Sequence, residues 1–166
     1  MPKNKLSLSV QYADPLLRDT LTRPLLRRWV QAALERPAEL TIRLVDGDEG
    51  RTLNRDFRGK DYATNVLTFV YNDEAAAEIG GARPDAQRIE PDGLTQADLI
   101  LCTDVLQSEA TAQGKSIVAH AAHLVVHGVL HAQGFDHDND ADAEAMERLE
   151  TRILATLGFS DPYRTE

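Results

Sequence analysis

The sequence predicts an α+β fold in which one mixed β-sheet of about four strands packs against helices. Segments 6–10 and 39–45 alternate apolar and polar side chains, which is the period of a half-buried strand. The last third of the chain instead has apolar side chains at helical spacing in three successive segments. The resulting order of strand, helix, strand, helix, strand, strand and three helices is typical of an α+β architecture.

The first half of the chain supplies three strands and two helices. A helix is expected within residues 14–34, where apolar side chains recur at helical spacing and Pro24 lies where a first turn tolerates proline. A shorter helix is predicted to begin after Asp46, which can cap it, and to end at Gly59. Residues 64–71 are rich in β-branched and aromatic side chains and predict the third strand.

The second half begins with residues 72–96, which lack periodicity and gather glycine and proline. This composition predicts a long, mobile loop. The short apolar run 97–102 fits a central strand. Three helices should follow, the first ending at Gly114, the second spanning residues 116–133 and the third residues 140–157.

Composition limits the class of protein. The 166 residues, 42% of them hydrophobic, suit a single domain covering residues 1–166. No apolar stretch is long enough for a secretion signal or a membrane span, so we expect a cytoplasmic protein with no membrane partner. The only cysteine, Cys102, cannot form an internal disulfide and is expected to be a buried apolar residue.

The formal net charge of −9 argues against non-specific binding of nucleic acid, so a polyanion partner would need a local positive field. One group of cations lies close together in the sequence: Arg51, Arg55, Arg58 and Lys60. Because Asp56 and Asp61 lie among them, an ordinary solvated helix face is the simpler interpretation of these residues alone. Asn65 either satisfies backbone groups at a strand start or contacts a substrate.

All five histidines fall within eighteen residues: His120, His123, His127, His131 and His137. Because a helix advances about 100° per residue, His127 and His131 lie one turn apart on the same face and can both reach one metal ion. Gly134 ends the helix and lets His137 return to the same ion, which leaves a fourth position open for water. An open position favours a catalytic metal over a structural one.

Zinc, one ion per chain, is the expected cofactor because three neutral imidazoles suit it, although nickel, copper or cobalt could use the same ligands. His120 and His123 would overfill a tetrahedral site and are expected to support the ligands or to pack. Asp136 could orient an imidazole or a bound water, or be an exposed turn residue. The acidic run 138–147 is expected to be a solvated helix start.

The stretch HGVLHAQGFDH resembles a zinc peptidase signature without its glutamate, because Gly128 stands where that general base would be. Peptide hydrolysis by that route is therefore disfavoured. The ion can instead lower the pKa of a bound water to about 7 or act as a Lewis acid on a phosphoryl oxygen. Arginine suits phosphate because its guanidinium can bridge two oxygens, which draws attention to Arg58.

RTLNRDFRGKDYATNVLTF (51–69) and HLVVHGVLHAQGFDH (123–137) together resemble the YbeY family of bacterial zinc-dependent endoribonucleases. The resemblance covers most of the chain from about residue 38 to residue 163 and includes the closing LGFSDPY. The chain departs from the family pattern in a longer 72–96 loop and at four single positions, none of them a predicted ligand: Thr68, Val70, Ala97 and Phe135.

The resemblance implies that His127, His131 and His137 bind zinc and that Arg58 is the catalytic residue that handles the RNA phosphate. It also implies a single-strand-specific endoribonuclease acting in small-subunit ribosomal RNA 3′-end maturation and ribosome quality control. The implied partners are single-stranded RNA, ribosomal RNA, the small ribosomal subunit and its proteins. Either a metal hydroxide or the 2′-hydroxyl of the RNA could be the attacking group.

Two other functions stay open from the sequence. One is a zincin-like metallopeptidase that borrows its base from elsewhere, for example from Asp136. The other is a non-catalytic ribosome-assembly factor whose structural metal holds the histidine helix and the following turn together.

Overall fold

The computed structural model describes residues 5–71, 94–135 and 139–163 of the chain. These residues form one sheet of four strands in the order β1-β2-β4-β3. The strands are β1 (Leu6–Tyr12), β2 (Ala38–Val45), β3 (Val66–Val70) and β4 (Thr95–Cys102). Strands β1, β2 and β4 run parallel, whereas β3 pairs antiparallel with β4 at the edge. The predicted α+β fold with one mixed sheet is confirmed.

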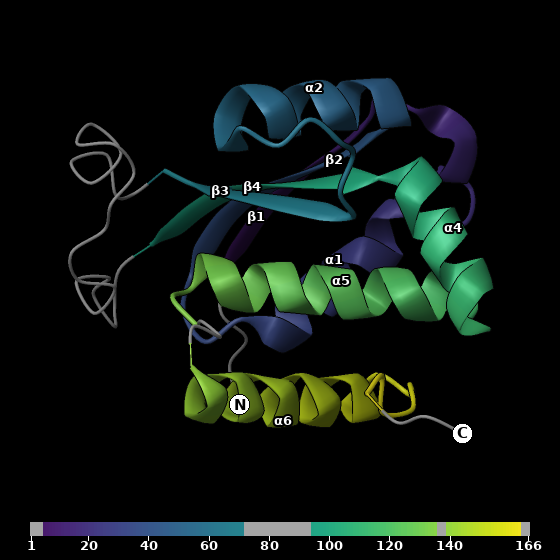
Figure 1. Ribbon diagram of the computed structural model, residues 1–166. Coiled ribbons are helices and arrows are strands. Elements are labelled where there is room, and N and C mark those ends of the chain that lie inside the picture. Colours follow the sequence, from purple (N-terminus) through teal and green to yellow (C-terminus); the bar gives the residue numbers. More distant parts are fainter. Residues whose placement is uncertain (1–4, 72–93, 136–138, 164–166) are drawn as a thin grey trace.

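Helices cover both faces of this sheet (Figure 1). They are α1 (Arg23–Ala33), α2 (Gly47–Arg58), α4 (Thr103–Gln113), α5 (Ile117–Ala132) and α6 (Asp140–Thr156), with a short 3₁₀ helix at Pro15–Leu17. Helix α2 packs on one face against β2 and β4, while α1 and α5 contact each other on the opposite face. Helix α6 forms an outer layer against α5.

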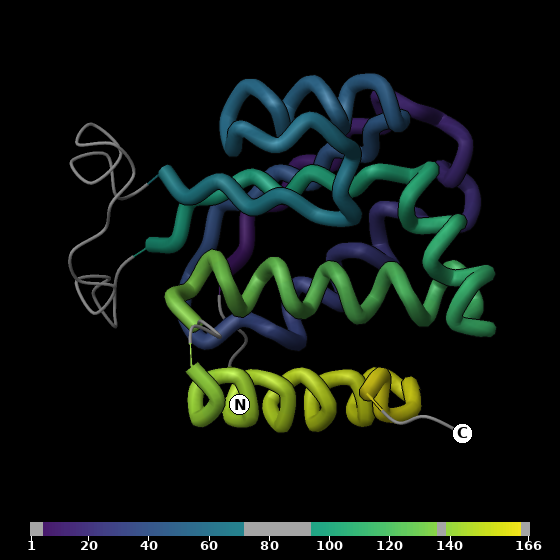
Figure 2. Tube along the Cα trace, viewed as in Figure 1, coloured from purple at the N-terminus to yellow at the C-terminus, as the bar shows by residue number. Residues whose placement is uncertain are grey.

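Helix α5 is the central helix, because the sheet covers one side of it and α6 covers another (Figure 2). Its apolar side chains are accordingly buried around most of its circumference. The approach to the sheet is closest at Gly128, where an added Cβ would lie 2.8 Å from Leu99 Cδ2 on β4. The glycine therefore lets α5 lie directly against the strand.

The first helix begins in the turn that contains Pro24, as the sequence predicted. Helix α1 starts at Arg23, with Pro24 in its first turn and the Thr22 side chain accepting a hydrogen bond from the Leu25 amide. Proline is tolerated there because the amides of a first turn have no partner within the helix. Asp14 caps a separate 3₁₀ helix that precedes α1, through the Leu16 amide.

The other helix boundaries follow the predicted caps closely. Asp46 accepts a hydrogen bond from the Glu49 amide at 2.9 Å, and Gly59 ends α2 with a φ of 72°. Cys102 is buried, as expected. Strand β4 begins at Thr95, two residues earlier than predicted, and the rest of the predicted loop, 72–93, lies outside the described residues. None of the described helices has the length and apolar character needed to cross a membrane.

Candidate active site

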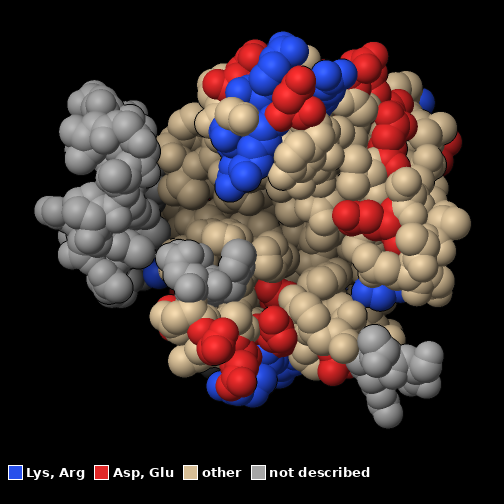
Figure 3. Space-filling model, in the orientation of Figure 1, with Lys and Arg blue, Asp and Glu red and all other residues tan. Residues whose placement is uncertain are grey.

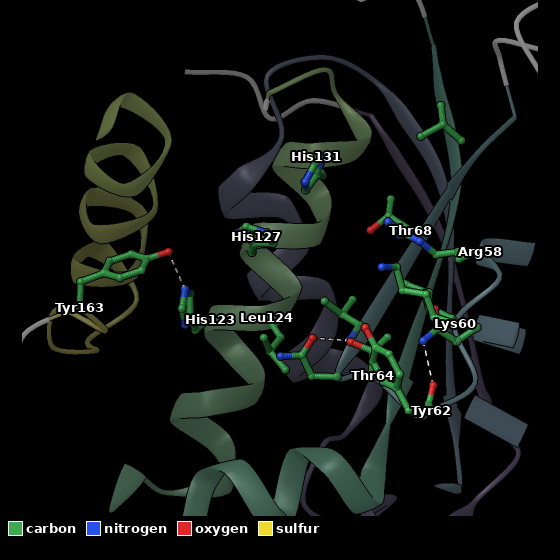
Figure 4. Close-up of a pocket in the computed structure, with 15 residues that line it drawn as sticks. Arg58, Lys60, Tyr62, Thr64, Thr68, His123, Leu124, His127, His131 and Tyr163 are labelled. Atoms are coloured by element: carbon green, nitrogen blue, oxygen red, sulfur yellow. Dashed lines mark hydrogen bonds between the residues drawn. The ribbon is translucent and has the colours of Figure 1, made fainter. Parts of the chain in front are cut away.

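A cavity of about 620 Å³ lies between α5 and the edge strand β3 (Figure 4). One wall is a face of α5 that carries His123, His127 and His131. The opposite wall comes from β3, from the C-terminal end of α2 and from the segment that joins the two. This second wall presents Arg58, Lys60, Tyr62, Thr64 and Thr68, among others. The cavity thus brings two of the three predicted histidine ligands, His127 and His131, into one site with the predicted arginine, about seventy positions away in the sequence.

His127 and His131 point into this cavity from successive turns of α5, as their spacing predicted. Their ring centroids are 5.3 Å apart and their planes are inclined by 77°. This separation suits two imidazoles that share one ion at nitrogen–metal distances of about 2.0–2.1 Å. The third predicted ligand, His137, lies outside the described residues, as does Asp136. Within the described residues, no group of three or more His, Cys, Asp or Glu side chains is arranged to hold a metal ion.

A buried carboxylate on α6, that of Glu150, forms hydrogen bonds with two of the histidines on α5. Glu150 is 0% exposed, and its oxygens lie 2.6 Å from His127 Nδ1 and 3.0 Å from His123 Nε2. The Tyr163 hydroxyl donates a third hydrogen bond to the same carboxylate. Burial raises the pKa of Glu150, but the hydrogen bonds from His123, His127 and Tyr163 outweigh burial and lower the pKa to about 2. Glu150 is therefore an ionised acceptor, and His127 carries its proton on Nδ1.

The sequence interpretation missed Glu150, because it lies just beyond an acidic run that was expected to be solvated. A signal was nevertheless present in the helical spacing. Glu150 follows Met146 by four positions and precedes Ile153 by three, and all three side chains lie on the buried face of α6. A glutamate on the apolar face of a helix calls for a buried hydrogen-bonding partner.

The two remaining histidines of α5, His120 and His123, each contact a carboxylate on a neighbouring helix. His120 is buried, and its Nε2 lies 2.9 Å from Glu109 Oε1. The same carboxylate oxygen accepts a hydrogen bond from Asn65 Nδ2 at 3.0 Å. Asn65 also accepts from the Val66 amide at 2.7 Å, which is the backbone role expected at a strand start. His120 and Asn65 are thus tied together beside the cavity that Asn65 helps to line.

The four cations of the 51–60 segment divide into two kinds. Arg51 forms a two-bond ion pair with Asp61 at 2.7 and 3.0 Å, which lowers the pKa of that carboxyl, and Arg55 lies 3.4 Å from Asp56. Arg58 and Lys60 line the cavity and form no ion pair with any residue that the structure describes. The solvated-face interpretation therefore fits the first two residues, while the other two are available to a ligand.

Charged side chains are distributed unevenly around the cavity (Figure 3). Lys and Arg side chains gather over α2 at one rim, with acidic side chains among them, and both acidic and basic side chains lie over α6 at the other rim. A net charge of −9 therefore coexists with a local positive field on one wall of the cavity.

The position of Gly128 explains the missing peptidase glutamate in structural terms. A side chain there would meet Leu99 and also come within 3.5 Å of Thr68 Oγ1. The α5 face that would carry the base is packed against the sheet. Glu150 is no substitute, since its oxygens already accept three hydrogen bonds. Among the described residues, no Asp or Glu side chain lines the cavity, so none is placed there to act as a general base.

Comparison with known proteins places this arrangement in a family. Residues 10–158 match the family model described as Endoribonuclease YbeY. The chain is 61% identical over 163 residues to the Endoribonuclease YbeY of Herminiimonas arsenicoxydans, covering 98% of both chains. It is 60% identical to that of Janthinobacterium sp. (strain Marseille), covering 98% of this chain and 97% of the relative.

A solution structure from Thermotoga maritima shares the fold, with a TM-score of 0.51 and 19% identity over 96% of this chain and 99% of that one. The family match extends from β1 to just beyond α6 and thus includes both walls of the cavity. The chain that carries these histidines and Arg58 belongs to the YbeY endoribonuclease family.

Proposed function

We propose that the protein is a zinc-dependent endoribonuclease that cuts single-stranded RNA in the cavity between α5 and β3. The observation that carries the proposal is the position of Arg58 and Lys60 across one cavity from His127 and His131. Neither cation forms an ion pair with a residue in the described part of the chain. Membership of a family whose relatives are named endoribonucleases supports RNA as the substrate.

The donor set fits zinc. The Nδ1 of His127 donates to Glu150, so Nε2 is the nitrogen that would bind a metal. A histidine held by a carboxylate in this way is the usual arrangement around protein-bound zinc. We assign His127, His131 and His137 as the ligands. The bound ion would supply positive charge to a phosphoryl oxygen and an activated water.

The side chains of the opposite wall would handle the substrate. The Arg58 guanidinium can bind two non-bridging oxygens of one phosphate, and the charge that builds up on them during cleavage would strengthen this contact. Lys60 adds a second positive charge on the same wall. Analysis of the product ends would identify the attacking group, since attack by water leaves a 5′-phosphate and attack by the RNA 2′-hydroxyl leaves a 2′,3′-cyclic phosphate.

We further propose that the cellular substrate is the 3′ end of small-subunit ribosomal RNA, processed in the cytoplasm in contact with small-subunit proteins as part of ribosome maturation and quality control. The family resemblance supports this assignment. Because the surface as a whole is acidic, contacts with ribosomal proteins would supply affinity that the cavity alone lacks.

The first test is cleavage of an end-labelled single-stranded RNA by zinc-loaded wild type, His127→Ala, Arg58→Ala and Arg51→Ala, all purified identically. We expect wild type and Arg51→Ala to cut at similar rates, because Arg51 is already paired with Asp61. Arg58→Ala should lose about 100-fold or more in kcat. Equal cutting by wild type and His127→Ala would show that the activity does not come from this site.

The same preparations separate the other two functions. A metallopeptidase would digest casein, which we expect to stay intact because Gly128 leaves no room for the base. An assembly factor with a structural metal would unfold when zinc is chelated. We expect the helical circular dichroism signal to persist in chelator, because the core is continuous around α5.

A further inference from the structure

Tyr62 lies on the same wall of the cavity as Arg58 and Lys60. It lies between Lys60 and Thr64 in the segment that joins α2 to β3, and all three residues line the cavity (Figure 4). Its side chain is on the wall opposite His127, and the residue is 54% exposed. An exposed aromatic ring beside free cations is the combination that binds single-stranded nucleic acid.

The other exposed aromatic residues have partners within the protein. Phe57 packs edge-to-face on Phe69 with ring centroids 5.5 Å apart. Tyr71 and Tyr163 each donate a hydrogen bond to a carboxylate. Among the described residues, the Tyr62 ring pairs with no other ring and its hydroxyl has no hydrogen-bond partner. Tyr62 is thus exposed without an internal contact that explains its position.

The backbone beneath Tyr62 is firmly held. Asn54, only 2% exposed, donates from Nδ2 to the Tyr62 carbonyl oxygen at 2.8 Å. The Asn54 carbonyl accepts from the Lys60 amide at 3.3 Å. One buried residue of α2 therefore fixes Tyr62 through its side chain and Lys60 through its backbone carbonyl, relative to Arg58 at the end of the same helix. A platform fixed before binding loses little conformational entropy when a ligand stacks on it.

We propose that Tyr62 is a stacking platform for one unpaired base of the RNA, while Arg58 and Lys60 hold the phosphates beside that base. The inference rests on the proposed function and adds a base-binding subsite to it. A base inside a duplex already stacks on its neighbours and cannot offer its face to a side chain. The subsite therefore gives a physical reason for acting on single strands. Because every base has a π-face, the stacking tolerates any sequence.

The first experiment compares steady-state cleavage of a single-stranded RNA by wild type, Tyr62→Ala, Tyr62→Trp and Phe57→Ala. Tyr62→Ala should raise KM roughly 5- to 150-fold with a smaller change in kcat, which is the range for loss of one stacked base. Tyr62→Trp keeps an aromatic face and should stay within a few-fold of wild type. Phe57→Ala removes a ring that is 66% exposed but does not line the cavity, and serves as the matched control.

A second experiment tests stacking itself. Single abasic nucleotides are placed in turn along the RNA, and KM is measured for wild type and Tyr62→Ala. One abasic position should raise KM for wild type but leave Tyr62→Ala unchanged, because the same contact is already lost. Equal effects of every abasic position in both proteins would overturn the inference, as would a wild-type KM for Tyr62→Ala. A wild type that cuts none of the RNAs would instead refute the proposed function, and this inference with it.

Discussion

At the scale of single residues, Glu150 determines how His127 is presented to the cavity. A neutral imidazole can carry its proton on either nitrogen, and the ionised carboxylate at 2.6 Å selects Nδ1. Nε2 is then left as the nitrogen with a lone pair. His123 and Tyr163 complete the hydrogen bonding of the carboxylate, so the buried charge is satisfied. The orientation of His127, a ligand in the proposed zinc site, thus depends on a residue that would not touch the metal.

Glu150→Gln keeps the size of the side chain but replaces an acceptor oxygen with an amide that donates. We expect zinc affinity to fall about 10- to 100-fold, because the amide favours the imidazole tautomer with its proton on Nε2. Competition with a chromogenic chelator measures this change, and thermal unfolding of the metal-free proteins checks that both remain folded. Glu147→Gln on the exposed face of α6 is the control. Equal zinc affinity in folded Glu150→Gln would contradict the positioning role.

At the scale of elements, α5 both contributes to the core and carries the histidines. Its close approach to β4 at Gly128 sets the distance between the two walls of the cavity, since β3 is hydrogen-bonded to β4. A larger side chain at this position would push α5 away from the sheet. Packing of the core and geometry of the site are therefore coupled through one glycine.

Gly128→Val should lower the free energy of unfolding by about 1–3 kcal/mol, because its side chain overlaps with the buried Leu99. Urea denaturation of Gly128→Val, Leu99→Ala and the double variant measures the coupling. We expect the double variant to lose less unfolding free energy than the two single variants lose together, by about 0.5–3 kcal/mol, since Leu99→Ala makes room for the valine. Strict additivity would show that the two side chains do not compete for space.

The elements also show which features a sequence can predict. Caps such as Asp46 and the glycine at the end of α2 act through adjacent residues, so the predicted boundaries agree with the structure. The start of α1 agrees as well, because Pro24 marks a first helical turn through its own backbone. The pairing of Glu150 with His127 joins two helices, and no local pattern specifies such a contact.

At the scale of the whole molecule, net charge is a poor guide to the site. The excess of acidic residues argues against binding a polyanion, yet local pairing decides which cations are available. Asp61 neutralises Arg51, while Arg58 and Lys60 face the cavity. The sequence places acids among these cations but does not say which are paired. Only the fold reveals the two that stay free among the described residues.

Salt dependence of RNA binding tests this division. For single strands, the logarithm of the binding constant falls with the logarithm of salt concentration by about 0.7 per phosphate neutralised. Arg58→Ala and Lys60→Ala should each reduce the magnitude of that slope by about 0.7, whereas Arg51→Ala should leave it unchanged because Asp61 already pairs with Arg51. Fluorescence anisotropy with a labelled oligonucleotide over a series of salt concentrations measures the slopes. If only Arg51→Ala reduced the magnitude of the slope, Arg51 and not Arg58 or Lys60 would be the residue that contacts phosphate.

The hydrogen bonds around Glu150 also bear on the order of events during synthesis. His127 is made 36 residues before Tyr163, which at 5–20 residues per second corresponds to about 2–7 seconds of translation. During that interval Glu150, which accepts the hydrogen bond from His127, is synthesised first. Tyr163, which donates a further hydrogen bond to Glu150, follows last. A growing chain therefore lacks the complete set of hydrogen bonds behind His127 until Tyr163 has been synthesised.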